Sequence, residues 1–313
     1  MEFDEFTAMN TLIQSAAEGE PTRLQAGFEG VRQFFADSER RFSRFRQDSE
    51  LSRLNRAAGS WFQASPELFE VVQEVLDLHR LTGGLFDPSI LNALQRAGYD
   101  RSMDEIKALS AIPVVEPEKW VRPQFGKTQL AAKRSAICLP KGVQIDLGGI
   151  AKGWTAAKAA ALLSYYSPAC TVNAGGDMVC VGLPQGQSAW QISLEDPRDE
   201  QQVLAVLKIS PGALATTSIT RRRWMQGSQP RHHVIDPRRG QPVESNWLSI
   251  SVYAPTATQA EAFAKALLML SEAEILAFMK PFHQLRFLAV DSTGKLWGTP
   301  QSKEIIDVPE YIQ

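Results

Sequence analysis

The chain has 313 residues, of which 44% are hydrophobic and 22% are charged, a composition that excludes a disordered protein. Its 33 lysines and arginines nearly balance 35 aspartates and glutamates, so the net charge of -2 argues against a nucleic-acid partner. The three cysteines, Cys138, Cys170 and Cys180, stand apart without a CxxC pair, which argues against a disulfide scaffold and a thiolate zinc site.

The N-terminal residues show none of the features of a signal peptide. Three acids fall within the first five residues, where a signal peptide carries basic residues before an apolar core. No apolar run approaches the roughly 18 residues of a membrane span. We therefore expect a cytoplasmic protein with no membrane-spanning segment, and the sequence leaves open a longer precursor with an export signal.

Helical periodicity predominates in the first third of the chain. Apolar residues recur at helical spacing over 23–44 and 66–82, a helix start is predicted at Ser49, and residues 103–110 are expected to form a short helix. These segments predict a more helical part at about 20–110.

The rest of the chain mixes strands and helices. Further helices are expected over 152–163 and 257–270. Strands are expected over 143–147, 170–173, 178–182, 189–194, 203–209, 248–254 and 287–290, and those between 178 and 209 are expected to share one antiparallel sheet. Without an internal repeat or a low-complexity linker, the pattern predicts an α+β fold in a single domain over residues 1–313.

The segment IDLGGIAKGW, Ile145–Trp154, combines an acid, two glycines and a lysine at a predicted strand-to-helix junction. Asp146 ends the strand, and Lys152 falls in the first turns of the helix. Glycines let a phosphate approach the backbone, and the free N–H groups at a helix start favour an anion. The spacing matches neither a P-loop nor GxGxxG, and a plain strand-to-helix turn is the simpler interpretation of this segment alone.

Two later segments add further polar groups. VNAGGD, Val172–Asp177, places two glycines and an acid after a strand and suggests a second glycine-rich edge facing the same ligand. In RHHVIDPRRGQPV, Arg231–Val243, His233 is suited to proton transfer near neutral pH, and nearby arginines could bind phosphate oxygens. The alternative is a solvated basic loop beside a core histidine, and this is the interpretation we prefer for His232.

A fourth segment, TGGLFDPS or Thr82–Ser89, follows a predicted helix. Gly83 can serve as a simple helix C-cap, while the aromatic and acidic residues after it can line a pocket for a flat ring. Taken in order, the four segments resemble the ApbE family of FAD:protein FMN transferases. The resemblance extends from Met9-Asn10-Thr11 to about residue 270 and also includes Phe42–Asn55, Ala213–Ser218 and Ala260–Leu270.

The resemblance implies an ApbE-type fold, a T-fold-like α+β body with mixed sheets, packed helices and an FAD cleft. It also implies an activity, because ApbE proteins cleave the FAD pyrophosphate with Mg²⁺, release AMP and join FMN to a Thr or Ser hydroxyl of a target flavoprotein. By position, His233 is expected to activate the acceptor hydroxyl. The positions expected to contact FAD are Met9, Phe45, Leu85, Phe86, Asp87, Asp146, Lys152 and Ile235.

The expected metal site departs from the family pattern. Backbone oxygen near Gly149 and two side chains of the last motif should hold Mg²⁺, but here Glu261 replaces the family's Asp and Lys265 replaces its Thr. A protonated lysine has no lone pair and cannot be a ligand. Three interpretations stay open: Lys265 stands in for the metal as a point charge, Mg²⁺ binds through Glu261 and backbone carbonyls, or Glu261 and Lys265 form an exposed i,i+4 ion pair.

These departures leave more than one function open. The leading hypothesis is a flavin transferase that acts on a protein hydroxyl. The alternatives are an FAD-binding protein with weak or no transferase activity, and an FAD pyrophosphatase that uses water as the acceptor and yields FMN and AMP.

Overall fold

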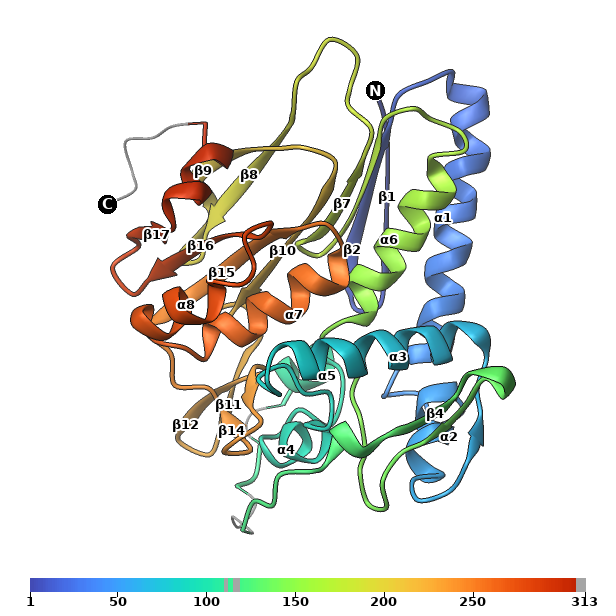
Figure 1. The fold of residues 1–313 in the computed structure, drawn as a ribbon, viewed down its shortest axis with the longest axis vertical. Helices are drawn as coiled ribbons and strands as arrows, with labels where there is room; N and C mark the ends of the chain where they lie inside the picture. The colour runs from blue at the N-terminus through green and yellow to red at the C-terminus, as the bar shows by residue number, and fades with distance from the viewer. Residues whose placement is uncertain (110–111, 115–118, 308–313) are drawn as a thin grey trace. The chain divides into compact units, whose positions relative to one another are not determined.

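The computed structural model describes residues 1–109, 112–114 and 119–307, and Figure 1 shows their helices and strands. Contacts between residues group the chain into two compact units. Unit 1 contains Met1–Ala36, Lys152–Arg221 and the residues from Ser245 onward, and unit 2 contains Asp37–Ala151 and Arg222–Glu244. Each unit therefore combines segments that are far apart in the sequence. The single domain over residues 1–313 stays a prediction.

Unit 1 is built on an antiparallel sheet. Among the residues that the structure describes, eight strands form it in the order β1-β2-β6-β7-β10-β15-β16-β17. They are β1 (Glu2–Ala8), β2 (Thr11–Ala17), β6 (Cys170–Ala174), β7 (Asp177–Val181), β10 (Gly212–Ser218), β15 (Trp247–Ala254), β16 (Arg286–Asp291) and β17 (Leu296–Gly298). The strands predicted over 170–173, 178–182, 248–254 and 287–290 are confirmed within this sheet.

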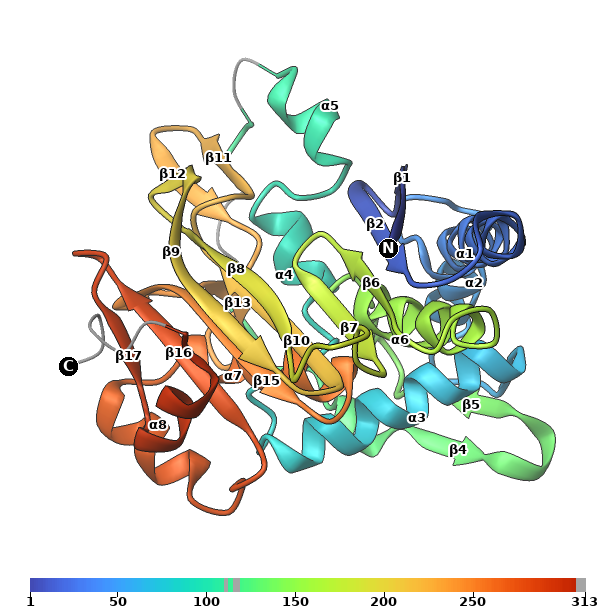
Figure 2. The same ribbon diagram turned by 90° about the horizontal axis from the view of Figure 1, so that it is seen from above.

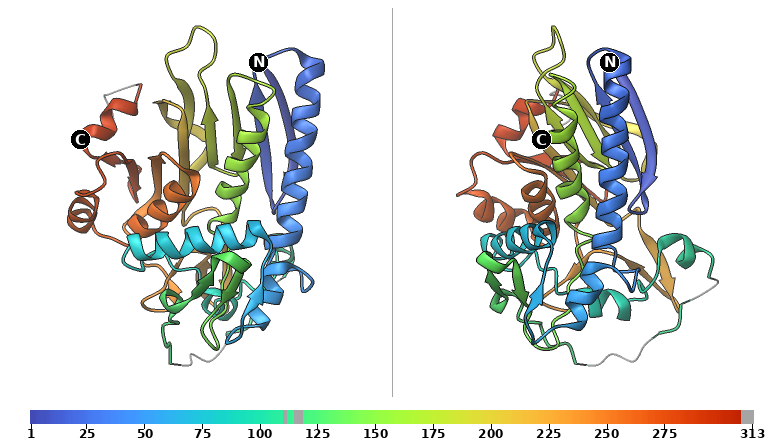
Figure 3. Two further views of the ribbon diagram at one scale, coloured as in Figure 1. Left: turned by 45° about the vertical axis from the view of Figure 1, so that its right-hand side comes forward. Right: turned by 90° about the vertical axis from the view of Figure 1, so that its right-hand side faces the viewer.

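Helices α1 (Pro21–Phe42) and α6 (Ala151–Leu163) lie side by side against one face of this sheet (Figure 3). Gly27 and Gly30 of α1 allow a close approach, because a Cβ at either position would stand 2.9 Å from a leucine side chain of α6. The apolar side chains between helices and sheet include Leu24, Phe28, Phe35, Leu163 and Val172. Helix α7 (Ala257–Leu268) packs against β10 and β15, and α8 (Glu272–Met279) follows it.

A separate hairpin covers the other face of the sheet. Strands β8 (Trp190–Asp196) and β9 (Asp199–Ile209) pair only with each other among the described strands (Figure 2). The prediction that they share one sheet with β7 is therefore wrong. The reason is packing: Trp190 and Leu207 of the hairpin bury against Leu214 of β10, so the hairpin stacks on the sheet instead of extending its edge.

The β1–β2 hairpin at the N-terminus was not predicted by the periodicity. Its turn consists of Met9 and Asn10, which both have positive φ values, 51° and 56°, between the paired residues Ala8 and Thr11. Two positive φ angles are typical of a type I′ turn, in which asparagine and glycine are common and methionine is not. The turn therefore lacks the Asn-Gly signal that marks such hairpins in a sequence.

Unit 2 contains the helices α2 (Glu50–Arg56), α3 (Pro66–Leu81), α4 (Leu91–Arg96) and α5 (Met103–Lys107). Its strands are β3 (Phe62–Gln63), β4 (Gln129–Ala131), β5 (Ala136–Cys138), β11 (Arg223–Gln226), β12 (Gln229–His232), β13 (Ile235–Asp236) and β14 (Gln241–Pro242). The helix start at Ser49 is confirmed, because its hydroxyl accepts the N–H of Ser52. The predicted 103–110 helix ends at Lys107, and residue 110 lies outside the described residues. The described helices are all too short or too polar to span a membrane.

The strand predicted over 143–147 is wrong, because this segment bonds to a side chain and a loop instead of a neighbouring strand. Asn55 Nδ2 donates to the carbonyl of Ile145 at 2.9 Å, and the N–H of Ile145 donates to Asn55 Oδ1 at 2.8 Å. The N–H of Asp146 donates to the carbonyl of Pro88 at 2.8 Å. These hydrogen bonds pair the backbone N–H and carbonyl groups that a neighbouring strand would otherwise pair. They also connect three of the motif segments.

Candidate functional site

In unit 2, a buried arginine joins two of the motif segments. The guanidinium carbon of Arg44 lies 4.2 Å from the ring centroid of Phe45 and 4.4 Å from that of Tyr99. Its Nη1 donates to the carbonyl of Tyr99 at 2.7 Å, and its Nε lies 3.5 Å from Oδ1 of Asp146. Only 6% of the Arg44 side chain is exposed, so its contacts are shielded from solvent. Arg44 thus holds Phe45 and Asp146 near each other.

Further contacts place Ile235 and the glycine loop around the same core. Ile235 belongs to an apolar cluster with Tyr99 and Trp224, against which Phe45 packs. The N–H of Gly148 donates to Oδ1 of Asp146 at 3.1 Å. Three predicted FAD contacts of unit 2, Phe45, Asp146 and Ile235, are therefore parts of one packed region. Arg44 was not singled out from the sequence, because only the folded chain brings it beside Asp146.

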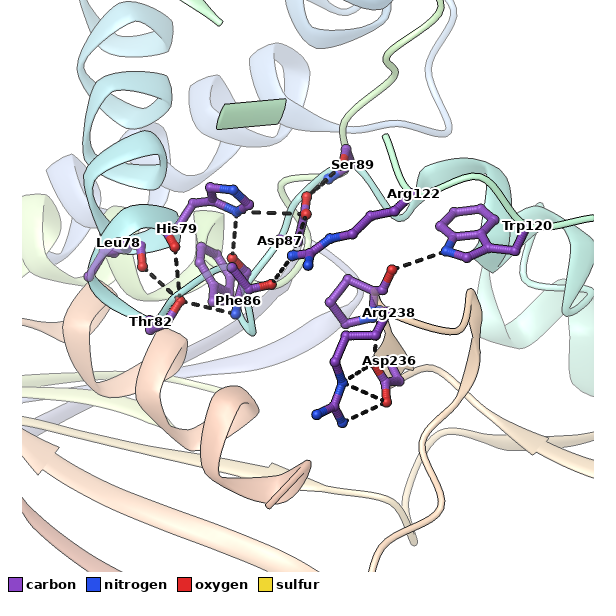
Figure 4. A network of polar contacts seen from close by, with 12 residues as sticks. Leu78, His79, Thr82, Phe86, Asp87, Ser89, Trp120, Arg122, Asp236 and Arg238 are labelled. Atoms are coloured by element: carbon purple, nitrogen blue, oxygen red, sulfur yellow. Dashed lines mark hydrogen bonds and ion pairs between the residues drawn. The ribbon is translucent and has the colours of Figure 1, made fainter. Parts of the chain in front are cut away.

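The loop that follows α3 is fixed by its own buried polar groups (Figure 4). Oδ1 of Asp87 accepts the N–H of Ser89 at 2.9 Å, while Oδ2 lies 3.4 Å from Nη2 of Arg122 and 3.7 Å from Nδ1 of His79. The hydroxyl of Thr82 donates to a carbonyl of α3 and accepts the N–H of Phe86 at 3.1 Å. Only 1% of the Asp87 side chain is exposed, so its carboxylate stabilises the loop from within.

The predicted FAD contacts in this loop differ in burial. Leu85 is half-buried, whereas Phe86 and Asp87 are buried. Because the Asp87 carboxylate already has partners within unit 2, its structural role in the loop is clear. Contact of Leu85, Phe86 and Asp87 with FAD stays a prediction.

A segment through Trp120 and Arg122 contacts two motif loops of unit 2 (Figure 4). Arg122 donates to the carbonyl of Gly84 in one loop, and Nε1 of Trp120 donates to the carbonyl of Pro237 in the other at 3.0 Å. Gly240, with φ of 63°, is close to the Trp120 ring, because a Cβ there would stand 2.2 Å from it. Sequence spacing gave no signal for Trp120 or Arg122, since both lie outside the motifs.

The two neighbouring histidines have different surroundings. Nε2 of His232 lies 3.1 Å from the carbonyl oxygen of Val243, and burial lowers the pKa of His232, in agreement with the structural role preferred for it. His233 is half-buried between β12 and β13, and its role as a base stays a prediction. Burial raises the pKa of Asp236, but hydrogen bonds from Arg238 outweigh burial and hold that pKa below its usual value.

In unit 1, two hairpin turns lie next to each other at one end of the sheet. Gly175 and Gly176 form the turn between β6 and β7, with φ values of 64° and 98°. A Cβ at Gly175 would stand 2.1 Å from Oγ1 of Thr11, the first residue of β2, so a residue with a side chain does not fit there. Met9 is partly buried against the apolar core of α1 and α6, and its contact with FAD stays a prediction.

Four charged side chains of unit 1 meet beside these turns, and we call Lys152, Asp177, Glu261 and Lys265 the charge cluster. Nζ of Lys152 donates to the carboxylate of Asp177 and lies 3.2 Å from Oε1 of Glu261. Nζ of Lys265 lies 3.9 Å from the same Glu261 oxygen. The Glu261 side chain is 0% exposed, that of Asp177 5%, Lys152 12% and Lys265 19%. The interpretation of Glu261 and Lys265 as an exposed pair is therefore wrong.

The charge cluster does not fit a resident Mg²⁺, which requires a near-octahedral set of oxygen ligands. In the described ranges, no group of three His, Cys, Asp or Glu side chains lies close enough to hold a metal ion. Oε1 of Glu261 faces two ammonium groups, and a Cβ on Gly153 would stand 2.8 Å from its Oε2. Gly149 belongs to unit 2, and its pairing with Glu261 in a metal site stays a prediction.

Comparison with known sequences identifies the family. The sequence model of the ApbE family matches residues 9–289. This chain belongs to the ApbE family. The FAD:protein FMN transferase of Treponema pallidum is 28% identical over 278 residues, which cover 83% of this chain and 75% of that protein. The FAD:protein FMN transferase of Vibrio cholerae is 28% identical over 235 residues, which cover 74% of this chain and 69% of that protein.

Solved structures of ApbE proteins share the fold. The ApbE protein of Thermotoga maritima superposes with a TM-score of 0.83 at 22% identity and covers 97% of this chain and 99% of its own. The flavin transferase ApbE of Vibrio cholerae gives a TM-score of 0.79 at 22% identity, with 97% and 99% covered. The predicted ApbE-type α+β fold is therefore confirmed.

Proposed function

We propose that this chain is an FAD:protein FMN transferase. The observation that carries the proposal is the ApbE match over residues 9–289, because it contains every candidate residue from Met9 to Lys265. The sequence relatives bear this activity in their names. The contacts within each unit add support, since they hold the motif side chains in fixed positions.

The proposed reaction is phosphoryl transfer without a change of oxidation state. The hydroxyl oxygen of a Thr or Ser on a target flavoprotein attacks the phosphorus that belongs to the FMN half of FAD. A new oxygen–phosphorus bond forms, the bond to the bridging oxygen breaks, and that oxygen leaves on AMP. The hydroxyl proton passes to a base, for which His233 is the candidate. Positioning and charge neutralisation supply most of the acceleration in such reactions.

The candidate binding residues of each unit suit different parts of FAD. In unit 2, the ring of Phe45 offers a face for stacking, and the carboxylate of Asp146 offers a hydrogen-bond acceptor. In unit 1, Lys152 stands in the first turn of α6, where an ammonium group and helix N–H groups both favour phosphate. We assign no step to Mg²⁺, because the charge cluster does not fit it.

Variants at the two adjacent histidines test the proposal. The assay combines FAD with an acceptor flavoprotein that the Vibrio cholerae transferase flavinylates under the same conditions, and it measures covalent FMN on the acceptor by mass. His233→Ala is expected to slow transfer about 100-fold or more while FAD binding, followed by flavin fluorescence, stays unchanged.

The matched control is His232→Gln, because His232 contacts the backbone carbonyl of Val243. This variant should transfer FMN at nearly the wild-type rate. Wild-type rates in the His233→Ala variant would contradict the assignment of the base. No covalent FMN from the wild-type protein on a competent acceptor would contradict the function itself.

A further inference from the structure

The charge cluster of unit 1 is balanced without a metal ion. The carboxylates of Asp177 and Glu261 carry two negative charges, and the ammonium groups of Lys152 and Lys265 carry two positive charges. A divalent cation added beside Glu261 would leave an excess of two positive charges in a site shielded from water. Because charges interact strongly where solvent is excluded, this arrangement opposes such an ion.

The position of Lys265 decides which cation faces Glu261. The two residues are separated by four positions on α7, so the helix places them on one face, and the order from Glu to Lys is the favourable one. Lys265 also stands where the family motif that the sequence resembles has a threonine. A threonine hydroxyl offers oxygen lone pairs to a metal, whereas an ammonium group offers only a positive charge and donors.

The second oxygen of Glu261 is not open to a metal ion either. Oε2 is buried and has no hydrogen-bond partner in the part of the chain that the structure describes. It lies against Gly153 of α6, where a Cβ would stand 2.8 Å away. Helix α6 therefore covers this oxygen, and a hydrated Mg²⁺ has no room to reach it.

The exposed part of the cluster is cationic. Asp177 and Glu261 are almost completely buried, while the side chains of Lys152 and Lys265 retain partial exposure. An approaching ligand therefore meets the side chains of the two lysines before the carboxylates. Such a surface attracts phosphate oxygens and repels divalent cations.

We propose that this chain binds the pyrophosphate of its nucleotide with the ammonium groups of Lys152 and Lys265 and holds no divalent cation in the charge cluster. The identity of the phosphate ligand rests on the proposed function, whereas the exclusion of the cation does not. Lys265 then supplies the charge that a metal ion would supply, so binding and transfer should not depend on added Mg²⁺.

Metal binding to the protein without flavin tests the exclusion directly. Mn²⁺ is the probe, and its free concentration is followed by electron paramagnetic resonance during titration of wild type, Lys265→Thr and Lys265→Arg. Wild type and Lys265→Arg should show no site in this cluster, whereas Lys265→Thr should bind Mn²⁺ at least about tenfold more tightly than wild type. Equal binding by wild type and Lys265→Thr would overturn the proposal.

A second measurement needs only the wild-type protein, so it decides the matter even if a variant fails to fold. A ligand that binds the folded state raises the midpoint of thermal unfolding. Because the charge cluster binds no Mg²⁺ in this proposal, unfolding in EDTA and in excess Mg²⁺ should give the same midpoint. A higher unfolding midpoint in Mg²⁺ than in EDTA would overturn the proposal.

FAD binding forms the third measurement and separates the two proposals. Flavin fluorescence titrations in EDTA and in Mg²⁺ should give the same dissociation constant for wild type, and Lys265→Met should weaken binding about tenfold or more. Binding that requires Mg²⁺ would contradict the role of Lys265. Metal-independent FAD binding without any FMN transfer would contradict the transferase function and leave the charge cluster account supported.

Discussion

Buried carboxylates occur in both units, but their partners differ. In unit 2, Asp87 and Asp236 accept hydrogen bonds from backbone N–H groups of their own loops and contact arginines. In unit 1, Asp177 and Glu261 face lysine ammonium groups instead. An arginine fork fixes the geometry of its partner, whereas an ammonium group is a rotatable point charge. Unit 2 thus uses its acids to fix loops, and unit 1 uses its acids to hold cations.

The largest effect is expected from removing the lysine shared by both acids of unit 1. Lys152→Met should lower the free energy of unfolding by about 3–5 kcal/mol, because it leaves the buried carboxylates of Asp177 and Glu261 without this partner. Urea unfolding at pH 7 measures the change. Lys158→Met, at an exposed position of the same helix, is the matched control and should cost no more than about 1 kcal/mol, because it removes an exposed contact of Lys158 with the Trp154 ring. An equal loss of stability in both variants would contradict the role of Lys152 as the partner of the two buried carboxylates.

Replacing a neutral side chain of unit 2, that of Asn55, should cause the next largest loss of stability. Asn55→Ala removes both hydrogen bonds to the backbone of Ile145 and is expected to cost about 1–3 kcal/mol, because the buried backbone groups lose their partner. Ser52→Ala on the same helix removes a more exposed hydrogen bond to Arg46 and should cost about 0.5 kcal/mol or less. If the two variants unfold at the same urea concentration, the Asn55 contacts do not fix the glycine loop.

The smallest effect concerns pH and the loop-fixing acid Asp236. Its pKa lies below the usual value of an aspartate, so the carboxylate contributes stability above its unfolded-state pKa and loses that stability as the pH falls through its folded-state pKa. Asp236→Asn should lower the free energy of unfolding at pH 7 by no more than about 1 kcal/mol, because its partner Arg238 is half exposed. The variant should also lose less stability than wild type between pH 7 and pH 3, and a steeper loss would contradict this role.

The sequence predicted the elements whose signal is local. The helices over 23–44, 66–82 and 152–163 have clear apolar periodicity, and each appears within a few residues of its predicted bounds. The strands predicted over 170–173, 178–182, 189–194, 203–209, 248–254 and 287–290 also appear within a few residues of their predicted bounds, whereas β10 and the strands of unit 2 are not predicted. The hairpin at Met9 was missed because its turn has no glycine, and the segment 143–147 was assigned wrongly because its partner is the distant side chain of Asn55.

The candidate site was predicted as a set of residues, but not as a set of contacts. The glycine-loop motif points to Asp146 and Lys152, because glycine loops and charged residues at helix starts are visible in a sequence, whereas Glu261 follows only from the resemblance to the family. Their partners come from the fold: Arg44 beside Asp146, and Asp177 beside Lys152. The burial of Glu261 could not be deduced from i,i+4 spacing, because that spacing does not tell which face of α7 packs on the sheet.

Metal-independent transfer by this protein is tested by measuring AMP and protein-bound FMN in a single reaction. Wild-type protein, FAD and the competent acceptor flavoprotein are combined once in EDTA and once in Mg²⁺. If Lys265 replaces the charge of a metal ion, AMP and covalent FMN on the acceptor form in equal amounts and at the same rate in both conditions. AMP accompanied by free FMN, or product that appears only with Mg²⁺, would contradict this prediction.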